Sequence, residues 1–356
     1  MHTRTFLAAV VGLGLVTLSA CSSSSGSEAD SKTVTLVSHD SWAVSKSVLQ
    51  DFEKQSGYKV RVLKDGDAGQ AVNKAILTKD NPQGDVFFGV DNTLLSRALD
   101  NGLFQPYEAK GLGTVGTAYQ LDAAKHRVTP IDYGDICVNY DKAYFSKHKL
   151  TPPTSYADLV KPQYKNLLVT ENASTSSPGL GFLLGSAAQY GDSGWQGYWK
   201  KLQANGVKVV DGWEQAYNEE FSGSAGGKKA GGDRPLVVSY ASSPPAEVIY
   251  ADPKPSTAPT GVATGTCFRQ IEFAGLLSNA GNTKGGKALI DFLVSKEFQE
   301  DMPLNMFVYP VVKGASVPAE FTKYGPAAQD PETMAPDKIA ANRDQWVKTW
   351  TSLVLK

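Results

Sequence analysis

Short apolar strands alternate with amphipathic helices between residues 33 and 99, and this alternation limits the possible folds more than any other feature. The expected strands and helices, in chain order, are 33–38 (strand), 45–56 (helix), 58–63 (strand), 70–77 (helix), 84–89 (strand) and 94–99 (helix). The strands are rich in β-branched residues, and the helices place apolar residues on one face. This order predicts an α/β fold with a parallel sheet, whose ligands bind at the carboxyl ends of the strands.

The same alternation returns in the second part of the chain, after a long extended segment at 128–140. The expected elements there are strands at 166–170, 207–210 and 236–240, helices to Tyr190 and from Ser193 to Asn205, and a helix through Ala216 and Phe221. A second extended segment, 265–273, leads to helices at 285–293, from Ser295, and at 336–355. We therefore expect two lobes with mixed sheets and flanking helices, joined by two crossing strands as in a hinged clamp.

The expected boundaries follow from this order. Lobe 1 takes residues 33–134, lobe 2 takes 135–266, and the chain returns to lobe 1 with its C-terminal helices over 267–356. The Gly- and Lys-rich segment 223–232 is expected to be an exposed, mobile loop.

The N-terminus is typical of an exported protein. A short basic region precedes the apolar run Phe6–Val16, which is short for a membrane span, and Leu18-Ser19-Ala20-Cys21 follows. This motif resembles the lipobox of bacterial lipoproteins. We expect a signal peptide over 1–20, lipid attachment at Cys21, a flexible tether over 21–32, and an extracytoplasmic protein anchored to the cell membrane.

Charge and cysteine content narrow the function classes. The chain has 35 Lys and Arg against 36 Asp and Glu, and the two signs are interspersed, which argues against nucleic acid as a partner. The four His residues are scattered and there is no CxxC motif, so we expect no metal site and no cofactor. Cys137 and Cys267 lie in the two crossing segments, and we expect a disulfide if these segments run side by side.

The stretch Asn172–Phe182 predicts a loop that leads into a helix. Ser177 suits the N-cap and Pro178 the first helical position. The hydroxyls of Ser174, Thr175 and Ser176 lie beside this helix start. Two interpretations stay open from this stretch alone: a well-capped helix without a ligand, and an anion site.

No catalytic motif is present: there is no G-x-S-x-G elbow, P-loop, H-E-x-x-H or G-x-G-x-x-G after a strand. We therefore expect a binding protein, with a secreted hydrolase as a less favoured alternative. Turns at the strand ends bring together the aromatic residues, hydroxyls and carboxylates of 39–42, 65, 91, 213 and 240–243. This combination suits a heteroaromatic cation with a hydroxyl or phosphate tail.

The chain resembles the thiamine-binding proteins, the substrate-binding components of bacterial thiamine ABC transporters, from about Val34 to Leu353. The stretches that carry the resemblance are Thr170–Gly181, Asp211–Tyr217, Val238–Pro244, Asp132–Gly134 and Tyr309–Val311. The resemblance implies a type II periplasmic-binding-protein fold, capture of thiamine or its phosphates between the lobes, and delivery to permease and ATPase subunits. A monomer is expected.

Roles can be carried over at matching positions. Trp213 and Tyr240 match residues that line the thiamine site, while Asp65-Gly66 and Ser174–Ser176 match those around its hydroxyl or phosphate end. The full set of expected ligand-binding residues is His39, Asp40, Trp42, Asp65, Gly66, Ser174, Thr175, Ser176, Trp213, Tyr240, Ser242, Asn305 and Phe307.

Three positions depart from the family pattern. His39 and Ala246 stand where relatives carry tyrosine, and Phe307 stands where they carry tryptophan. Ferric iron, a polyamine, another cation or a phosphonate therefore remain alternative ligands of the same fold. Iron would call for clustered phenolates and carboxylates, and Tyr240 is followed by Ala241 rather than by a second tyrosine.

Overall fold

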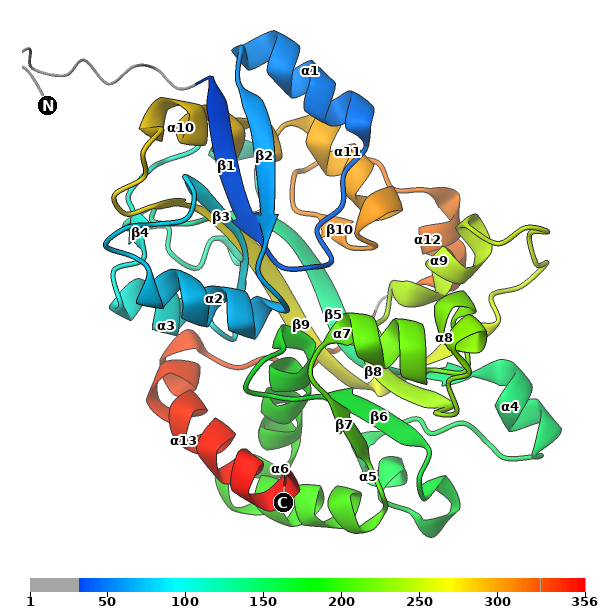
Figure 1. Cartoon of the computed structure of the whole chain (residues 1–356). Coiled ribbons are helices and arrows are strands. Elements are labelled where there is room, and N and C mark those ends of the chain that lie inside the picture. Colours follow the sequence, from blue (N-terminus) through cyan, green and yellow to red (C-terminus); the bar gives the residue numbers. More distant parts are fainter. Residues whose placement is uncertain (1–31, 327, 356) are drawn as a thin grey trace, which may run out of the picture. The chain divides into compact units, whose positions relative to one another are not determined.

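The computed structural model describes residues 32–326 and 328–355 (Figure 1). The expected signal peptide, the lipid attachment at Cys21 and nearly all of the tether lie outside the described residues. Within the described ranges, no helix is both long enough and apolar enough to span a bilayer.

The described strands and helices follow the expected alternation closely. The strands are β1 (Thr33–Ser38), β2 (Lys59–Lys64), β3 (Val86–Asp91), β4 (Phe104–Gln105), β5 (Thr129–Asp141), β6 (Leu168–Glu171), β7 (Lys208–Val210), β8 (Leu236–Tyr240), β9 (Thr260–Leu277) and β10 (Tyr309–Pro310). The helices are α1 (Lys46–Ser56), α2 (Ala68–Leu77), α3 (Leu95–Asp100), α4 (Lys142–Lys147), α5 (Tyr156–Leu159), α6 (Ser177–Ala204), α7 (Trp213–Gln215), α8 (Ala225–Ala230), α9 (Ser243–Ile249), α10 (Thr283–Leu293), α11 (Lys296–Asn305), α12 (Ala319–Tyr324) and α13 (Pro336–Val354). Short turns of 3-10 helix occur at Leu112–Thr114, Thr117–Tyr119 and Pro162–Tyr164, and Ala216–Glu220 is a π-helical turn.

The described strands join into one mixed sheet in the order β2-β1-β3-β9-β5-β8-β6-β7, with β4 on β9 and β10 on β5. Strands β1, β2 and β3 are parallel, and so are β6, β7 and β8. We call these two groups, with the helices that follow their strands, the first half and the second half of the sheet. The antiparallel strands β5 and β9 lie between them, so both parallel groups point their carboxyl ends toward the middle.

Alternating side chains pack the first half between two layers of helices. Val37 and Phe87 face the cluster that contains the buried residues of α2 and α3. Their neighbours Leu36 and Phe88 face the cluster formed with α1 and α10. This period of two along each strand is what a sheet covered on both faces requires.

The second half agrees with expectation around residue 191 and differs in one place. The two helices expected on either side of residue 191 are both present within α6, separated by the non-helical backbone of Gly191, whose φ of 69° is accessible to glycine at low cost. The segment 223–232 is not a loop throughout, because it contains α8, although Lys228 and Lys229 are exposed as expected. Ser224 is buried and caps this helix by accepting from the amide of Gly227 at 2.9 Å.

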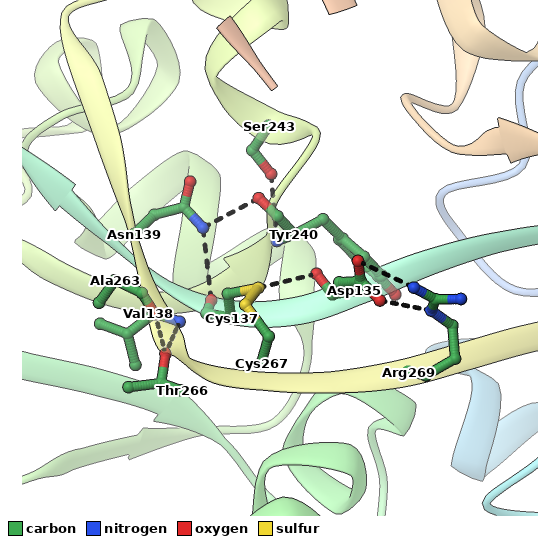
Figure 2. The surroundings of a disulfide bond; sticks show 10 residues. All are labelled: Asp135, Cys137, Val138, Asn139, Tyr240, Ser243, Ala263, Thr266, Cys267 and Arg269. Carbon is green, nitrogen blue, oxygen red and sulfur yellow. Dashed lines mark hydrogen bonds and ion pairs between the residues drawn. A yellow bond between two sulfur atoms is a disulfide. The ribbon is translucent and has the colours of Figure 1, made fainter. Parts of the chain in front are cut away.

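Crossing strand β5 has the expected length, whereas β9 is longer than expected, and the two strands are paired side by side. β5 pairs with β9 from Thr129 opposite Ala274 to Asp141 opposite Thr260. A disulfide joins Cys137 of β5 to Cys267 of β9, which is the pairing that the sequence predicts (Figure 2). Next to it, Asp135 and Arg269 form an ion pair across the same two strands at 2.5 Å. These cross-links fix the middle of the sheet, from which the site is built.

Candidate functional site

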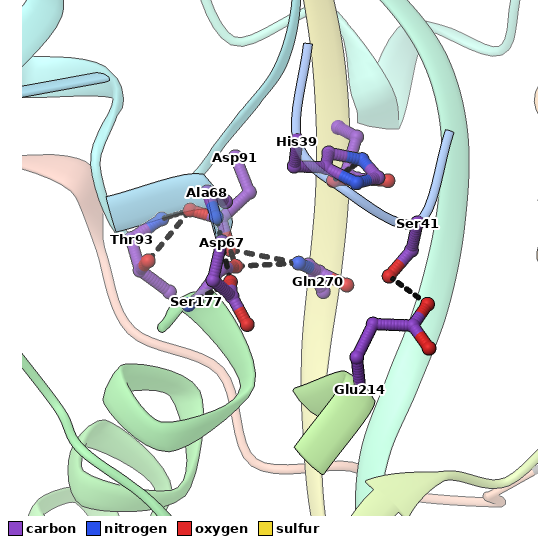
Figure 3. A network of polar contacts seen from close by, with 10 residues as sticks. His39, Ser41, Asp67, Ala68, Asp91, Thr93, Ser177, Glu214 and Gln270 are labelled. Atoms are coloured by element: carbon purple, nitrogen blue, oxygen red, sulfur yellow. Dashed lines mark hydrogen bonds and ion pairs between the residues drawn. The ribbon is translucent and has the colours of Figure 1, made fainter. Parts of the chain in front are cut away.

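A small chamber lies where the strands of both halves end. The lining residues are His39, Ser41, Asp67, Ala68, Ser177, Pro178, Trp213, Tyr240, Ser243, Gln270, Glu272, Met306, Phe307 and Val308. Its volume is about 60 Å³. The polar side chains come from both halves and from β9, which crosses between them (Figure 3).

A wider groove of about 390 Å³ continues outward from the chamber and shares Ser41, Trp213, Met306 and Phe307 with it. We call the two together the cleft. The groove adds Asp40, Lys64, Glu214, Ala246 and Glu247 to the lining. The hydroxyl of Ser41 donates to Glu214 at 3.0 Å and so joins the two halves at the mouth of the chamber.

Aromatic rings form the wall that separates the chamber from the groove. Trp213 stacks on Tyr217 with ring centroids 5.1 Å apart and an interplanar angle of 13°. The indole nitrogen of Trp213 donates to Ser239 at 2.9 Å, which fixes the ring in place. Tyr240 lies edge-on to Trp213 at 6.4 Å. The wall therefore presents two π faces with set orientations.

Phe307 closes the other side and has an unusual backbone. Its φ of 56° lies in the left-handed region, which is uncommon for a bulky residue and costs free energy. Two contacts hold it there: Ser242 donates to its carbonyl at 2.6 Å, and its ring stacks on Phe321 at 6.0 Å. Phe307 lines both the chamber and the groove.

Asp67 links the two halves at the centre of the chamber. It follows β2 and caps α2 by accepting from the amide of Ala68 at 2.6 Å. The same carboxylate accepts from the amides of Trp213 at 2.8 Å and Ser177 at 3.4 Å, both in the second half. Burial raises the pKa of Asp67, and these backbone hydrogen bonds only partly offset that effect.

Asp91 is the second carboxylate at this point. One of its oxygens accepts from the amides of Thr93 at 3.0 Å and Leu94 at 3.2 Å, and so caps the turn before α3. The other accepts from the hydroxyl of Ser177 and from the amide of Gln270 at 2.9 Å. Burial raises the pKa of Asp91 against these hydrogen bonds.

Two further buried acids, on β5 and β6, have carboxylate oxygens without a hydrogen-bond partner. These are Asp132 and Glu171. Burial raises the pKa of Asp132 well above its usual value, and the nearby negative charge of Glu272 raises it further. Burial and the charge of Asp67 do the same for the pKa of Glu171. Such groups lower the stability of a protein unless a positive charge compensates them.

His39 is the ionisable base of the chamber. Its imidazole lies 3.5 Å from the carboxylate of Glu272, and the two side chains are 13% and 8% exposed. Burial alone would lower the pKa of His39, but the nearby carboxylate of Glu272 outweighs it and raises the pKa. The ring packs so closely on Gly89 that a Cβ there would lie 2.3 Å from it, and the φ of 99° at Gly89 also favours glycine.

The ionisable side chains that line the chamber, among the described residues, are thus acids and one histidine, with no lysine or arginine. Lys64 lies further out, in the groove. In the described part of the chain, no three His, Cys, Asp or Glu side chains are grouped so that they could hold a metal ion. An acidic chamber with π walls suits an organic cation.

The structure brings part of the expected residue set into the cleft. His39, Trp213, Tyr240 and Phe307 line the chamber. Asp40, Trp42 and Asn305 line the groove, although Trp42 is only 4% exposed and packs mainly on Phe88 at 4.8 Å. Ser242 does not line either cavity, but its hydroxyl donates to the carbonyl of Phe307, which does.

The other expected residues do not line either cavity. Asp65 forms an ion pair with Lys74 at 2.5 Å, and Gly66 forms a turn by donating to Asp40 at 3.1 Å. Ser174 donates to Asn172 at 2.7 Å, and Thr175 donates to the carbonyl of Asp211 at 2.6 Å. Ser174 and Ser176 face a separate pocket, described below.

The expected cap at the start of α6 is displaced by one residue. Ser176, not Ser177, precedes the helix, because the hydroxyl of Ser177 donates to Asp91 instead of to its own helix. The anions at this helix start are the carboxylates of Asp67 and Asp91 themselves. A phosphate at this position would meet two carboxylates.

Sequence reasoning missed three polar residues of the chamber lining, Asp67, Gln270 and Glu272, and the buried Asp132 close to Glu272. A signal was present for two of them. Gln270 and Glu272 are polar residues two positions apart in a largely buried strand, so they share one face of β9. A polar pair inside a buried strand indicates a site or a hydrogen-bond network.

Comparison with known proteins identifies the family of this chain. The model of the family described as bacterial extracellular solute-binding protein matches residues 81–242. The thiamine-binding periplasmic protein of Salmonella typhimurium is 31% identical over 327 residues, which cover 90% of this chain and 93% of the relative. This chain belongs to the family of the thiamine-binding periplasmic proteins. The predicted resemblance is confirmed.

Solved structures of the same family and fold agree. A periplasmic thiamin binding protein matches with a TM-score of 0.76 and 27% identity, over 90% of this chain and 96% of that chain. The apo ferric ion-binding protein A from Pasteurella haemolytica matches with a TM-score of 0.71 at 18% identity, over 90% and 98%, and shares the fold. The predicted fold class is therefore confirmed, and the members of this family are extracytoplasmic solute-binding proteins rather than enzymes.

The buried acids predict how stability depends on pH. The raised pKa values of these carboxylates mean that the folded protein binds protons more tightly than the unfolded chain, so the free energy of unfolding falls as the pH rises above the pKa values of the unfolded chain. The raised pKa of His39 acts in the same direction. Asp132→Asn removes one of these groups and should flatten the slope.

Urea unfolding at pH 5, 6.5 and 8 measures this slope. The matched control is Asp80→Asn, which changes an exposed carboxylate outside the cleft. The wild type and the control should lose stability in parallel, and Asp132→Asn should lose less. A slope for Asp132→Asn equal to that of the wild type would contradict the assignment of a raised pKa to Asp132.

Proposed function

We propose that this chain captures thiamine in the cleft for uptake by an ABC transporter. The observation that carries the proposal is the set of buried carboxylates beneath an aromatic wall, with no lysine or arginine among the described residues that line the chamber. Thiamine supplies the missing charge, because its thiazolium ring is permanently positive. The names of the relatives support the same ligand.

In this proposal the rings of thiamine are divided between the two cavities. Ligand pockets usually have roughly 300–1,000 Å³, so the chamber of about 60 Å³ is too small for a two-ring ligand, whereas the groove adds about 390 Å³. The thiazolium lies at the face of Trp213 or Tyr240, within reach of Asp67 and Glu272. Cation–π attraction and the carboxylates then act on the same charge.

The tail of the ligand extends into the groove. The start of α6 is less suited to a phosphate than the sequence suggested, since Asp67 and Asp91 already occupy its free amide and the hydroxyl of Ser177. Lys64 is the lysine of the groove lining, and a phosphorylated tail would point toward it. The departures at His39, Phe307 and Ala246 leave less aromatic enclosure than the family pattern and bear on how tightly the rings are held.

The two halves correspond to the lobes of a clamp in this proposal, with lobe 1 over 33–134 and 267–356 and lobe 2 over 135–266. A bound cation draws them together at Asp67, which already contacts the amides of Trp213 and Ser177 across the cleft. β5 and β9 are the hinge strands. The monomer is the functional unit, since both lobes belong to one chain.

The cellular setting follows from the N-terminal sequence. We place a signal peptide at 1–20, a lipid on Cys21 and a tether at 21–32, which together hold the protein at the outer face of the cell membrane. From there it delivers its ligand to the permease and ATPase subunits of the transporter. The Leu18-Ser19-Ala20-Cys21 motif supports the lipid anchor.

Calorimetry on residues 32–356 tests the ligand. Thiamine, thiamine monophosphate, spermidine and ferric citrate are titrated separately at pH 7.5. Thiamine should bind with a dissociation constant in the micromolar range or below and displace any weakly bound spermidine. Tight binding of iron with no heat from either form of thiamine would overturn the proposal.

The aromatic wall provides a graded test. Trp213→Ala removes a π face and should weaken thiamine binding by more than about 1 kcal/mol, or roughly fivefold or more. Trp213→Phe keeps a ring and serves as the matched control, with a smaller loss. Both variants need an unfolding temperature near that of the wild type. An unchanged affinity in a folded Trp213→Ala variant would assign Trp213 to packing alone.

A further inference from the structure

A second polar pocket lies on the far side of the segment that leads into α6. Its volume is about 270 Å³, and it is lined by side chains of α2, α3, α13 and the segment 173–180. In Figure 1 the red helix α13 runs beside α6, and contacts join α13 to both α6 and α3. We call this cavity the arginine pocket, after Arg97 and Arg343.

The arginine pocket is separate from the cleft. The two cavities have no lining residue in common. The wall between them is formed by a close approach of α2 to the segment before α6, where the amide of Gln70 donates to the carbonyl of Thr175 at 3.0 Å. A Cβ on Gly69 would lie 2.5 Å from that carbonyl oxygen, so the two backbones touch here.

Arg343 is buried without sufficient partners. It is 8% exposed, and its Nε–H has no hydrogen-bond partner. Its one ion pair is to Asp344 at 2.6 Å, and that carboxylate is 74% exposed to solvent, which weakens the attraction. Burial lowers the pKa of Arg343, against the charge of Asp344. A buried guanidinium of this kind is unfavourable unless an anion completes its hydrogen bonds.

The other charged side chains of the pocket do not neutralise the positive charge of Arg343. Arg97 also has a buried Nε–H without a partner, and it reaches the same Asp344 at 3.6 Å. Lys348 lines the pocket as well and forms no ion pair within the described residues. Two guanidinium groups thus share one exposed carboxylate, and Lys348 adds a third positive charge to the lining. Asn73 and Ser174 add neutral hydrogen-bonding groups to the lining.

We propose that the arginine pocket is a binding site for a small oxyanion, such as a phosphate or a carboxylate, held by the guanidinium groups of Arg97 and Arg343 with Lys348 at the entrance. A planar guanidinium donates two parallel hydrogen bonds to such a group, and the unpartnered Nε–H atoms are the donors available for it. The volume admits inorganic phosphate or a short organic anion. The pocket draws its residues from both halves of the sheet, so an anion there binds α2 and α3 to α6 and α13.

Inorganic phosphate is the probe. It is titrated into 15N-labelled protein (residues 32–356) at constant ionic strength, with chloride exchanged for phosphate. Saturable shifts should appear at the amides of Asn73, Ser174 and Lys348 and be absent at Trp213, which lines the cleft. Addition of thiamine should leave the phosphate-induced shifts in place, so the result does not depend on the ligand of the cleft.

Three variants identify the donors. Arg343→Gln should weaken phosphate binding by about tenfold or more, which is the size of one charge-assisted hydrogen-bonded contact. Lys348→Gln changes an exposed side chain, so we expect the variant to fold, and it should weaken binding to a smaller extent. Lys338→Gln, on the same helix but outside the pocket, should bind phosphate as the wild type does.

Two results would overturn the proposal. The first is an absence of saturable shifts around Asn73 and Ser174 up to high phosphate concentration. The second is an equal affinity in the wild type, Lys348→Gln and Arg343→Gln, which would mean that phosphate acts on the surface as a whole.

Discussion

The burial of several carboxylates without matching cations is the constraint on which the rest of this structure depends. Asp67, Asp91, Asp132 and Glu272 converge where the strands end, and their pKa values are raised where a shift is resolved. Such a cluster opposes folding, so the surrounding chain must hold it in place. The same carboxylates attract a cation to the cleft. The feature that lowers the stability of the folded protein is therefore also the feature that binds the ligand.

The crossing strands hold this cluster together. β9 carries Gln270 and Glu272 into the chamber only a few residues from Cys267, whose disulfide to β5 fixes the register. The amides of two helix starts, α6 and α7, meet at Asp67 from the opposite half. The carboxylate of Asp67 therefore contacts both halves of the sheet, as a clamp that closes around a cation requires. The arginine pocket lies behind the same helix start and places positive charge there.

The strand and helix order could be predicted because it depends on local patterns. Trp213, Tyr240, His39 and Phe307 could be assigned to the cleft because they follow strand ends or match the family. The acidic centre could not. Taken one at a time, Asp67 and Asp91 are interpreted as helix caps and Asp132 as part of a buried strand. The proximity of these three carboxylates depends on how separate segments of the chain fold together, which local patterns do not show. Asp65 and Ser174 were expected in the site through the family resemblance, and a turn sequence does not show on which side its side chains face.

The central claim is that the cleft recognises positive charge, and one comparison tests it directly. Thiamine and a neutral isostere, in which a thiophene replaces the thiazolium ring, are titrated by calorimetry at pH 7.5. The account predicts that thiamine binds at least about tenfold more tightly, since the isostere leaves the carboxylates uncompensated and loses a desolvated cation–π contact. Equal affinities for the two compounds would contradict it.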